Sequence, residues 1–502
     1  MDDTQNIIVR TPYCRITEET TLRGSKVNCA IPEEPTLGGS KVNCAIPEES
    51  TLGGSKVNCR ITGEDVSSNI TNIIIGDYSY DITNFNHPGG NVIKYMVGQD
   101  ATNVFEEFHF RSKKAKQILL TLPRTKIELP KDPQTTEQKM LEDFARFRKS
   151  LEDRGFFTPS YSHITYRIIE LFVIYSFAIY TMKYSMTVSV ILLGLFSGRC
   201  GWVQHEGGHT SFTGNIKTDK IIQNVFMGFG LLADGTMWNS MHNKHHATTQ
   251  KIGHDMDLDT APFVLFYPSN LDVSTQIAER FSTTKGEDDV TNGSIVNHTP
   301  TKPHFLDKVA RVWLKYQAYT FLPITSGIFV TFFWLLYLHP RKIIRDRNLT
   351  QALIVSVGHV SRIALFMKIG NATMYGALWY HFFTIWVAGV YLFGQFSLSH
   401  TFMPVVESNE NPNWVRYSLD HTVDIEPQNY AVSWIMGHLN NQVVHHLFPS
   451  MPQYRGPEVS KELVVFCKKW DLQYTIITYR EAWWKMFSNL RKVGNEVYYE
   501  RN

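Results

Sequence analysis

Residues 184–209 read YSMTVSVILLGLFSGRCGWVQHEGGH, a long apolar run that ends directly in two histidines. An apolar stretch of about 20 residues is long enough to cross a bilayer as a helix. His205 and His209 are four residues apart, so they share one face of a helix and can point to a common centre. This stretch therefore predicts a membrane helix that carries a pair of metal-ligating imidazoles at its end.

Two more histidine clusters and a single histidine extend this pattern. Residues 242–246 read HNKHH, residues 442–446 read QVVHH, and His400 ends another apolar run. These histidines are too many for one zinc ion, which takes about four ligands, and imidazole is a suitable donor to iron. The sequence therefore predicts two adjacent iron ions. The candidate catalytic and ligating residues are His205, His209, His242, His245, His246, His400, His445 and His446, with Gln442 beside them.

The number of membrane spans decides whether these clusters can meet. Four apolar segments reach spanning length, at residues 164–182, 184–203, 318–338 and 371–399. A fifth segment, 352–370, contains Arg362 and Lys368, and we expect it to lie at the membrane surface. Two spans then separate the first domain from His205 and His209, and two more separate that pair from His445 and His446, so all clusters face the same side. This count leaves the basic stretch 339–347 on the opposite side, against the positive-inside tendency.

A different motif precedes the spans. Residues 86–90 read NHPGG, and DATNVFEEFH follows at residues 100–109. Two histidines from separate segments, His87 and His109, can ligate a haem iron from both faces and leave no open position, which favours electron transfer. A β-rich run at 71–85 and helical segments up to residue 130 predict a small α+β domain around them.

Composition and the amino-terminal region give the remaining organisation. The chain has 502 residues, 49 Lys and Arg against 47 Asp and Glu, and a net charge of +2, so nucleic acid is not an expected partner. Cysteines at 14, 29, 44 and 59 mark a 15-residue repeat that is too polar to bury a core. The start is acidic and has no apolar signal segment. We expect five parts: a disordered repeat tail (1–60), a haem domain (61–130), an amphipathic linker on the membrane surface (131–160), a membrane domain (161–490) and a tail (491–502).

In combination, these motifs resemble those of the front-end fatty-acyl desaturases, membrane enzymes with an amino-terminal cytochrome b5 domain. The likeness covers residues 62 to 490, and Gln442 in place of a first histidine is its most discriminating feature. Longer stretches, including GWVQHEGGHTSFTGNIK and NQVVHHLFPSMPQ, look like the delta-6 acyl-CoA desaturases of green microalgae. The chain departs from the family where its repeat runs up to Asp65 and where the usual tryptophan before the central strand is absent.

The resemblance implies a fold, a reaction and partners. The fold would be a helical di-iron domain of four transmembrane helices with a cytosolic cap, joined to a cytochrome b5-like domain that binds haem b through His87 and His109. Electrons from NADH would pass through cytochrome b5 reductase and the haem to two irons, which use O2 to place a cis double bond in C18 polyunsaturated acyl chains. The acyl group would be bound to CoA or to phospholipid, in the endoplasmic reticulum membrane, with the amino terminus and histidine boxes cytosolic.

Several alternatives remain open at this point. Delta-5, delta-8 and delta-4 acyl desaturases, sphingolipid delta-8 desaturases and hydroxylases share the same motifs. His205-Glu206-Gly207-Gly208-His209 also matches the HExxH pattern of zinc proteases, in which the glutamate is the general base. A membrane-anchored cytochrome b5 would need neither the histidine clusters nor four spans. The acidic stretch 254–259 is either a solvated loop or a support that orients the box histidines.

Overall fold

The computed structural model describes most of the chain after the repeats. The described residues are 15–19, 26–30, 71–127, 135–255, 257–258, 260, 263–268, 305–407 and 409–499. Within the repeats, β1 (Arg15–Glu19) and β2 (Lys26–Ala30) pair as antiparallel strands, with Ile16 opposite Cys29. The predicted disorder of the tail stays a prediction. The rest of the predicted tail lies outside the described residues.

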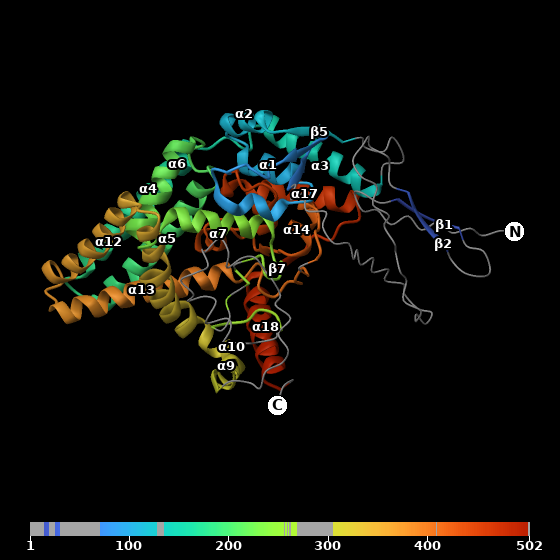
Figure 1. The fold of residues 1–502 in the computed structure, drawn as a ribbon. Coiled ribbons are helices and arrows are strands. Elements are labelled where there is room, and N and C mark those ends of the chain that lie inside the picture. Colours follow the sequence, from blue (N-terminus) through green and yellow to red (C-terminus); the bar gives the residue numbers. More distant parts are fainter. Residues whose placement is uncertain are drawn as a thin grey trace. The chain divides into compact units, whose positions relative to one another are not determined.

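The predicted α+β domain is present between residues 71 and 127 (Figure 1). Its sheet has the order β3-β4-β5, and its core contains the buried side chains of Ile73, Ile75 and Tyr80. The elements are β3 (Asn72–Ile75), β4 (Tyr78–Asp81), the 3-10 helix η1 (Gly90–Met96), α1 (Thr102–His109), α2 (Lys113–Thr121) and β5 (Arg124–Lys126). Alternate residues of β3 face the core, which is the pattern of a half-buried strand.

The linker is the helix α3 (Thr136–Asp153), which begins at a capping box formed by Thr135 and Gln138. Its apolar face is buried in the protein, where Phe144 and Leu151 are at most 1% exposed. They pack with residues of the carboxy-terminal part of the chain in one core cluster. The prediction that this face lies on a membrane is therefore wrong, because protein covers it.

Four long apolar helices form two antiparallel hairpins. The first pairs α4 (Tyr161–Thr181) with α5 (Met186–Gly208), and the second pairs α12 (Leu349–Lys368) with α13 (Met374–Phe396). The tips of the hairpins meet, since a Cβ at Gly370 would lie 2.4 Å from Cε of Met186. Both hairpins therefore begin and end on the same side, away from these tips.

Helices α5 and α13 run side by side in the same direction. Glycines make the close contact possible: added Cβ atoms at Gly194 and Gly198 would lie 2.5 Å and 2.2 Å from Val387 and Tyr391, respectively. Small residues at such positions let helix backbones approach in membrane proteins.

A fifth apolar stretch consists of α10 (Gln317–Thr320), the π-helix η3 (Phe321–Leu338) and α11 (His339–Arg345). By length and composition, the described residues contain five helices that could cross a membrane, including this stretch and α12. The expected interfacial segment at 352–370 is thus a full-length apolar helix paired with α13, which differs from the prediction.

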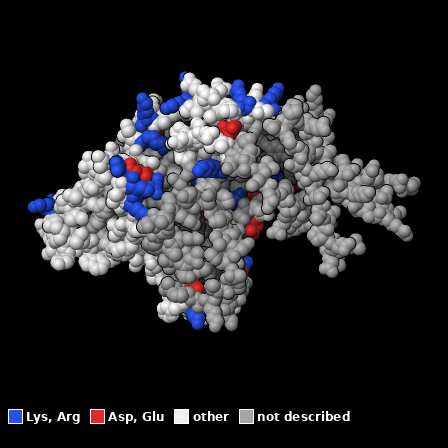
Figure 2. All heavy atoms as spheres, viewed as in Figure 1, with Lys and Arg blue, Asp and Glu red and all other residues white. Residues whose placement is uncertain are grey.

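The outer surface of these helices is apolar. Phe172 on α4, Val360 on α12 and Trp379 on α13 are each more than 60% exposed. In Figure 2 the flank formed by α12 and α13 shows almost only uncharged side chains, whereas Lys and Arg gather near α2 and α6. A large exposed apolar surface of this kind marks contact with lipid, and the chain is a membrane protein.

The remaining elements hold the other histidine clusters and the carboxy-terminal core. They are α6 (Ile216–Val225), the π-helix η2 (Phe226–Gly230), α7 (Gly235–Ala247), α9 (Phe305–Lys315), α14 (Trp414–Asp420), β6 (Asp424–Glu426), α15 (Tyr430–Ile435), α16 (Gln442–Leu447), the 3-10 helix η4 (Gln453–Arg455), α17 (Gly456–Lys469), β7 (Ile476–Thr478) and α18 (Tyr479–Tyr499). Strands β6 and β7 pair in parallel.

Candidate metal centre and haem pocket

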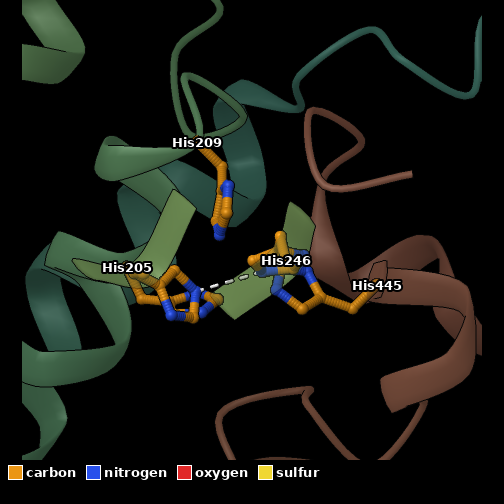
Figure 3. A group of neighbouring side chains, drawn as sticks. His205, His209, His246 and His445 are labelled. Atoms are coloured by element: carbon orange, nitrogen blue, oxygen red, sulfur yellow. Dashed lines mark hydrogen bonds between the residues drawn. The ribbon is translucent and has the colours of Figure 1, made fainter. Parts of the chain in front are cut away.

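The box histidines form two adjacent groups, each able to hold a metal ion. In each group, one possible ligand atom per residue lies within 4.8 Å of all the others. Figure 3 shows four members of the first group turned toward a common centre. The first group is His205, His209, His242, His246 and His445, and the second is His245, His400 and His446.

Neighbouring residues divide between the two groups. His245 and His246 on α7 belong to different groups, as do His445 and His446 on α16. Consecutive side chains on a helix point about 100° apart, so each pair reaches two centres at once. The rings of His246 and His446 stack with centroids 4.2 Å apart, which brings the groups side by side. The predicted convergence of all three clusters with His400 is present.

The chemistry of the ring nitrogens fits metal binding. Nε2 of His205, His209 and His446 is buried and has no hydrogen-bond partner among the residues that the structure describes. Buried polar atoms are rarely left without a partner, so these nitrogens fit a missing ligand bond. Burial also lowers the pKa of His242, His246 and His446 well below 6.5. These imidazoles are therefore neutral, which is the form that binds metal.

Polar side chains outside the boxes fix the orientation of three ligands. Nδ1 of His245 donates to the two carboxylate oxygens of Asp255 at 2.9 and 3.0 Å. Nδ1 of His446 lies 3.1 Å from Oγ1 of Thr249, and Nδ1 of His205 lies 2.5 Å from Nε2 of Gln453. In His245 and His446, a proton on Nδ1 leaves Nε2 available to the metal. The supporting role considered for the acidic stretch is thus present at Asp255, which is fully buried.

Asp255 also affects the charge of His245. Burial disfavours the charged imidazole, but the carboxylates of Asp255 and Asp257 outweigh it and raise the pKa of His245 to about 9. Without metal, His245 therefore holds a proton that a bound cation would replace.

Neither Thr249 nor Gln453 was predicted from the sequence, because no spacing rule connects them with the histidines that they contact.

Gln442 lies at the second group. Its Nε2 is 2.9 Å from Nε2 of His400, and its side chain is 4% exposed. The amide therefore lies beside the second group, and its direct contact is with His400.

Glu206 belongs to neither group. It is fully buried, and its nearest ionisable partner is Nε2 of His163 at 3.6 Å. The HExxH zinc-protease mechanism needs this glutamate beside the metal as general base. The geometry therefore argues against the protease alternative.

His87 and His109 form the predicted pair in the small domain. Their ring centroids are 5.9 Å apart and the rings are nearly perpendicular. Nδ1 of His87 donates to the carbonyl of Gly90 at 3.2 Å, and Nδ1 of His109 donates to that of Phe105 at 3.1 Å. Both Nε2 atoms thus remain available as ligands, which fits a haem iron held from two faces.

The glycines of the His-Pro-Gly-Gly motif have identifiable structural roles. A Cβ at Gly89 would lie 2.7 Å from Cε1 of His87, so a side chain there would displace the imidazole. Gly90 has a φ of +80°, a left-handed conformation that glycine adopts without strain.

The helix α1, which ends at His109, packs directly on the metal centre. The ring of Phe108 meets that of His246 edge to face, with centroids 6.5 Å apart. Buried Glu107 forms an ion pair with Arg148 of α3, and Arg111 donates to the carbonyl of Ser450, four residues after the last box histidine. The haem pocket and the metal centre are therefore neighbours within one compact unit.

An apolar cavity of about 260 Å³ opens beside the second group. His242, His245, His400 and Gln442 line one part of it. Its other walls come mainly from α5, η2, η3 and α13. A cavity of this kind can hold a long apolar chain against the metal ligands.

Comparison with known proteins agrees with this geometry. Residues 184–478 match the fatty acid desaturase family, and residues 63–145 match the cytochrome b5-like haem/steroid binding domain. The chain therefore belongs to the fatty acid desaturase family. It is a front-end desaturase, an oxidoreductase that acts on acyl lipids, and its cofactors are haem and iron.

Individual relatives share this two-domain plan. An acyl-lipid (8-3)-desaturase from Rebecca salina is 36% identical over 428 residues, covering 84% of this chain and 91% of the relative. A protein of the same name from a Thraustochytrium species is 34% identical over 447 residues, covering 85% and 92%. A delta(6)-fatty-acid desaturase from Caenorhabditis elegans is 24% identical over 437 residues, covering 82% and 93%. The predicted resemblance to delta-6 enzymes of green microalgae is not confirmed by these relatives.

Proposed function

We propose that the chain is a front-end acyl-lipid desaturase of the (8-3) type. In this reading of the relatives' name, an acyl chain with a double bond at carbon 8 receives a new one three carbons nearer the carboxyl end, at carbon 5. The observation that carries the desaturase assignment is the pair of adjacent histidine groups beside an apolar cavity and a fused haem domain.

The regiochemistry rests on the relatives alone. Those named acyl-lipid (8-3)-desaturases are 34 to 36% identical to this chain, whereas those named (9-3) or delta(6) are 24 to 25% identical. The delta-6 specificity predicted from the sequence is therefore a weaker candidate, as is the delta-8 activity named for a Euglena gracilis relative that is 26% identical, and sphingolipid delta-8 activity is a further alternative.

The residues named from the sequence would hold the cofactors. One iron would be bound by the first histidine group and the other by the second, with Gln442 beside it, and haem b by His87 and His109. Two reduced irons would supply the electrons that activate O2. Acid and base groups of side chains cannot perform this reaction. Asp255, Thr249 and Gln453 hold the ligands in place for this chemistry.

The cavity would position the substrate. An acyl chain along the cavity presents neighbouring methylene groups to His245 and His400. The depth to which the acyl chain enters the cavity would decide which carbons react. The apolar walls also exclude water. The balanced reaction takes two hydrogens from the chain, two electrons, two protons and O2, and gives a cis double bond and two waters.

We also propose how the chain lies in the membrane. The hairpins α4–α5 and α12–α13 would supply the four spans, and residues 317–345 would line the cavity instead of crossing. The basic stretch 339–347 then lies on the side of the histidines, as the positive-inside tendency favours. The amino terminus, the haem domain at 61–130 and the histidines would face the cytosol from the endoplasmic reticulum, where cytochrome b5 reductase supplies electrons from NADH.

Feeding experiments in yeast test the regiochemistry. Cells expressing the full chain receive 20:3 with double bonds at carbons 8, 11 and 14, or 18:2 at 9 and 12, or 20:2 at 11 and 14. The proposal expects a new double bond at carbon 5 of the 20:3 chain, located by mass spectrometry. A product only from 18:2, at carbon 6, would restore the delta-6 prediction, and one only from 20:2, at carbon 8, would indicate the delta-8 alternative.

A further inference from the structure

Arg362 is a buried cation in the middle of the helix α12. It is 5% exposed, and its Nη2 donates to Oγ of Ser197 on α5 and to the carbonyl of Gly230 on η2, both at 3.0 Å. The guanidinium therefore joins three segments of the apolar helical region. The function proposed above assigns no role to it.

No carboxylate pairs with Arg362 among the residues that the structure describes. A guanidinium has five N–H donors, and the two hydrogen bonds to protein both come from Nη2. An unpaired cation among membrane helices is costly and is rare outside functional positions. The presence of the unpaired Arg362 cation therefore points to a function in the cavity that this residue lines.

The guanidinium lies at the end of the cavity that is farther from the metal ligands. Ser197 lies eight residues before His205 on the same helix, a rise of about 12 Å. Along α13, the lining residue farthest from His400 is Ile385, fifteen residues before it, or about 22 Å if helical throughout. Met227 and Leu335 pack with Ile385 in one apolar cluster, and Leu392 also lines the cavity.

We propose that Arg362 forms a polar floor to the acyl-chain cavity and limits the length of the chain on its methyl side. This inference rests on the proposed desaturase function. Each methylene gains by contact with the apolar walls. A methyl group against the guanidinium would instead remove water from N–H donors without replacing the lost hydrogen bonds. The bonds to Ser197 and Gly230 also prevent the side chain from turning aside.

Substitution at the floor tests this proposal. The full chain and Arg362→Met are given acyl substrates with identical double bonds, counted from the carboxyl end, that differ by two carbons at the methyl end. Two further buried methylenes are worth at most about 15-fold in relative conversion, at about 0.8 kcal/mol each. We expect the ratio of long-chain to short-chain conversion to rise several-fold, toward this limit.

A matched variant isolates the charge. Arg362→Lys keeps a cation at the floor and should keep the wild-type ratio. An unchanged ratio in Arg362→Met, recovered in the membrane fraction at wild-type level, overturns the inference. If the wild type converts no member of the series, the proposed function fails instead.

A probe of the wild type covers the case in which Arg362→Met does not fold. An acyl chain of the greatest accepted length is compared with the same chain carrying a terminal hydroxyl. The free N–H donors of the floor would bond the hydroxyl, so conversion should be equal or higher. A fall of tenfold or more would indicate an apolar end to the cavity and would overturn the inference.

Discussion

The haem pocket and the metal centre both use histidine, but they are built in opposite ways. His87 and His109 belong to one continuous stretch, and each donates to a backbone carbonyl within four residues of itself. The histidines of the metal centre come from segments between residues 205 and 446, and their supports are side chains from other segments. The first site depends on local chain geometry, and the second depends on the packing of the whole membrane domain.

The largest effect is expected from a substitution that damages the metal centre and leaves the haem pocket intact. In His446→Ala, the second group loses one of its three histidines, so product should fall at least about 100-fold. The haem absorbance should not change, because His87 and His109 are local to their own domain. Fatty-acid analysis and a reduced-minus-oxidised spectrum of the same membranes measure both. Product at the wild-type level would contradict the proposed ligand set.

The substitution His109→Ala should have the opposite effect, damaging the haem pocket and leaving the metal centre intact. We expect loss of the haem spectrum and a fall in product of at least about tenfold, since electrons no longer arrive through the fused domain. The iron content of the purified protein should stay at the wild-type value. Phe85→Leu, which removes a ring 6.0 Å from His87 without removing a ligand, is the control and should keep the haem. Loss of iron together with haem would show that the sites are not independent.

A smaller effect is expected at a support of the metal centre. Asp255→Asn keeps the shape of the side chain but removes the negative charge that His245 faces at 2.9 Å. Loss of such a support lowers metal affinity by about tenfold, at the low end of the usual range. Iron retained during dialysis against a chelator measures it. Retention equal to that of the wild type would mean that the carboxylate does not support the ligand.

The smallest expected effect concerns the linker helix between the two sites. Hydrogen bonds from Lys469 and Trp470 lower the pKa of Asp143 on α3 to about 2. Because the pKa is lower in the folded protein, this stabilisation is complete above about pH 4 and is lost as the pH falls toward 2. It should amount to less than about 1 kcal/mol, because the pair lies near the surface.

Hydrogen exchange of the α3 amides measures that effect. In the wild type, protection should decrease between pH 4 and pH 2, and in Asp143→Asn this decrease should be absent. Arg146→Gln removes only an exposed partner of Asp143 and serves as the control. An equal decrease in wild type and Asp143→Asn would assign the acid sensitivity to another group.

The contrast between the two sites also explains what the sequence could predict. The His-Pro-Gly-Gly turn and the histidine spacings are local, so the ligand candidates could be named in advance. The division of His445 and His446 between two groups depends on how α16 is rotated against α7, and no spacing rule contains that rotation. The support from Gln453 joins positions 248 residues apart and has no local signal.

The membrane helices show a second limit. Because of the charge of Arg362, a membrane span was not predicted at 352–370. In the folded chain, Arg362 donates hydrogen bonds to Ser197 and Gly230. Residues 318–338 belong to a helix that is apolar and long enough to cross a membrane, and many of them also line the cavity, which requires apolar side chains as well. Hydropathy alone does not distinguish a lipid-facing surface from a cavity wall.

The glycine contacts between α5 and α13 have a consequence for the spacing of the metals. One helix carries His205 and the other leads to His400, and they pack closely where Gly194 and Gly198 meet the side chains of Val387 and Tyr391. A bilayer of different thickness changes helix tilt at modest cost. Because these two helices are in direct contact, they would tilt together. The distance between the two groups should therefore be the same in thin and thick membranes.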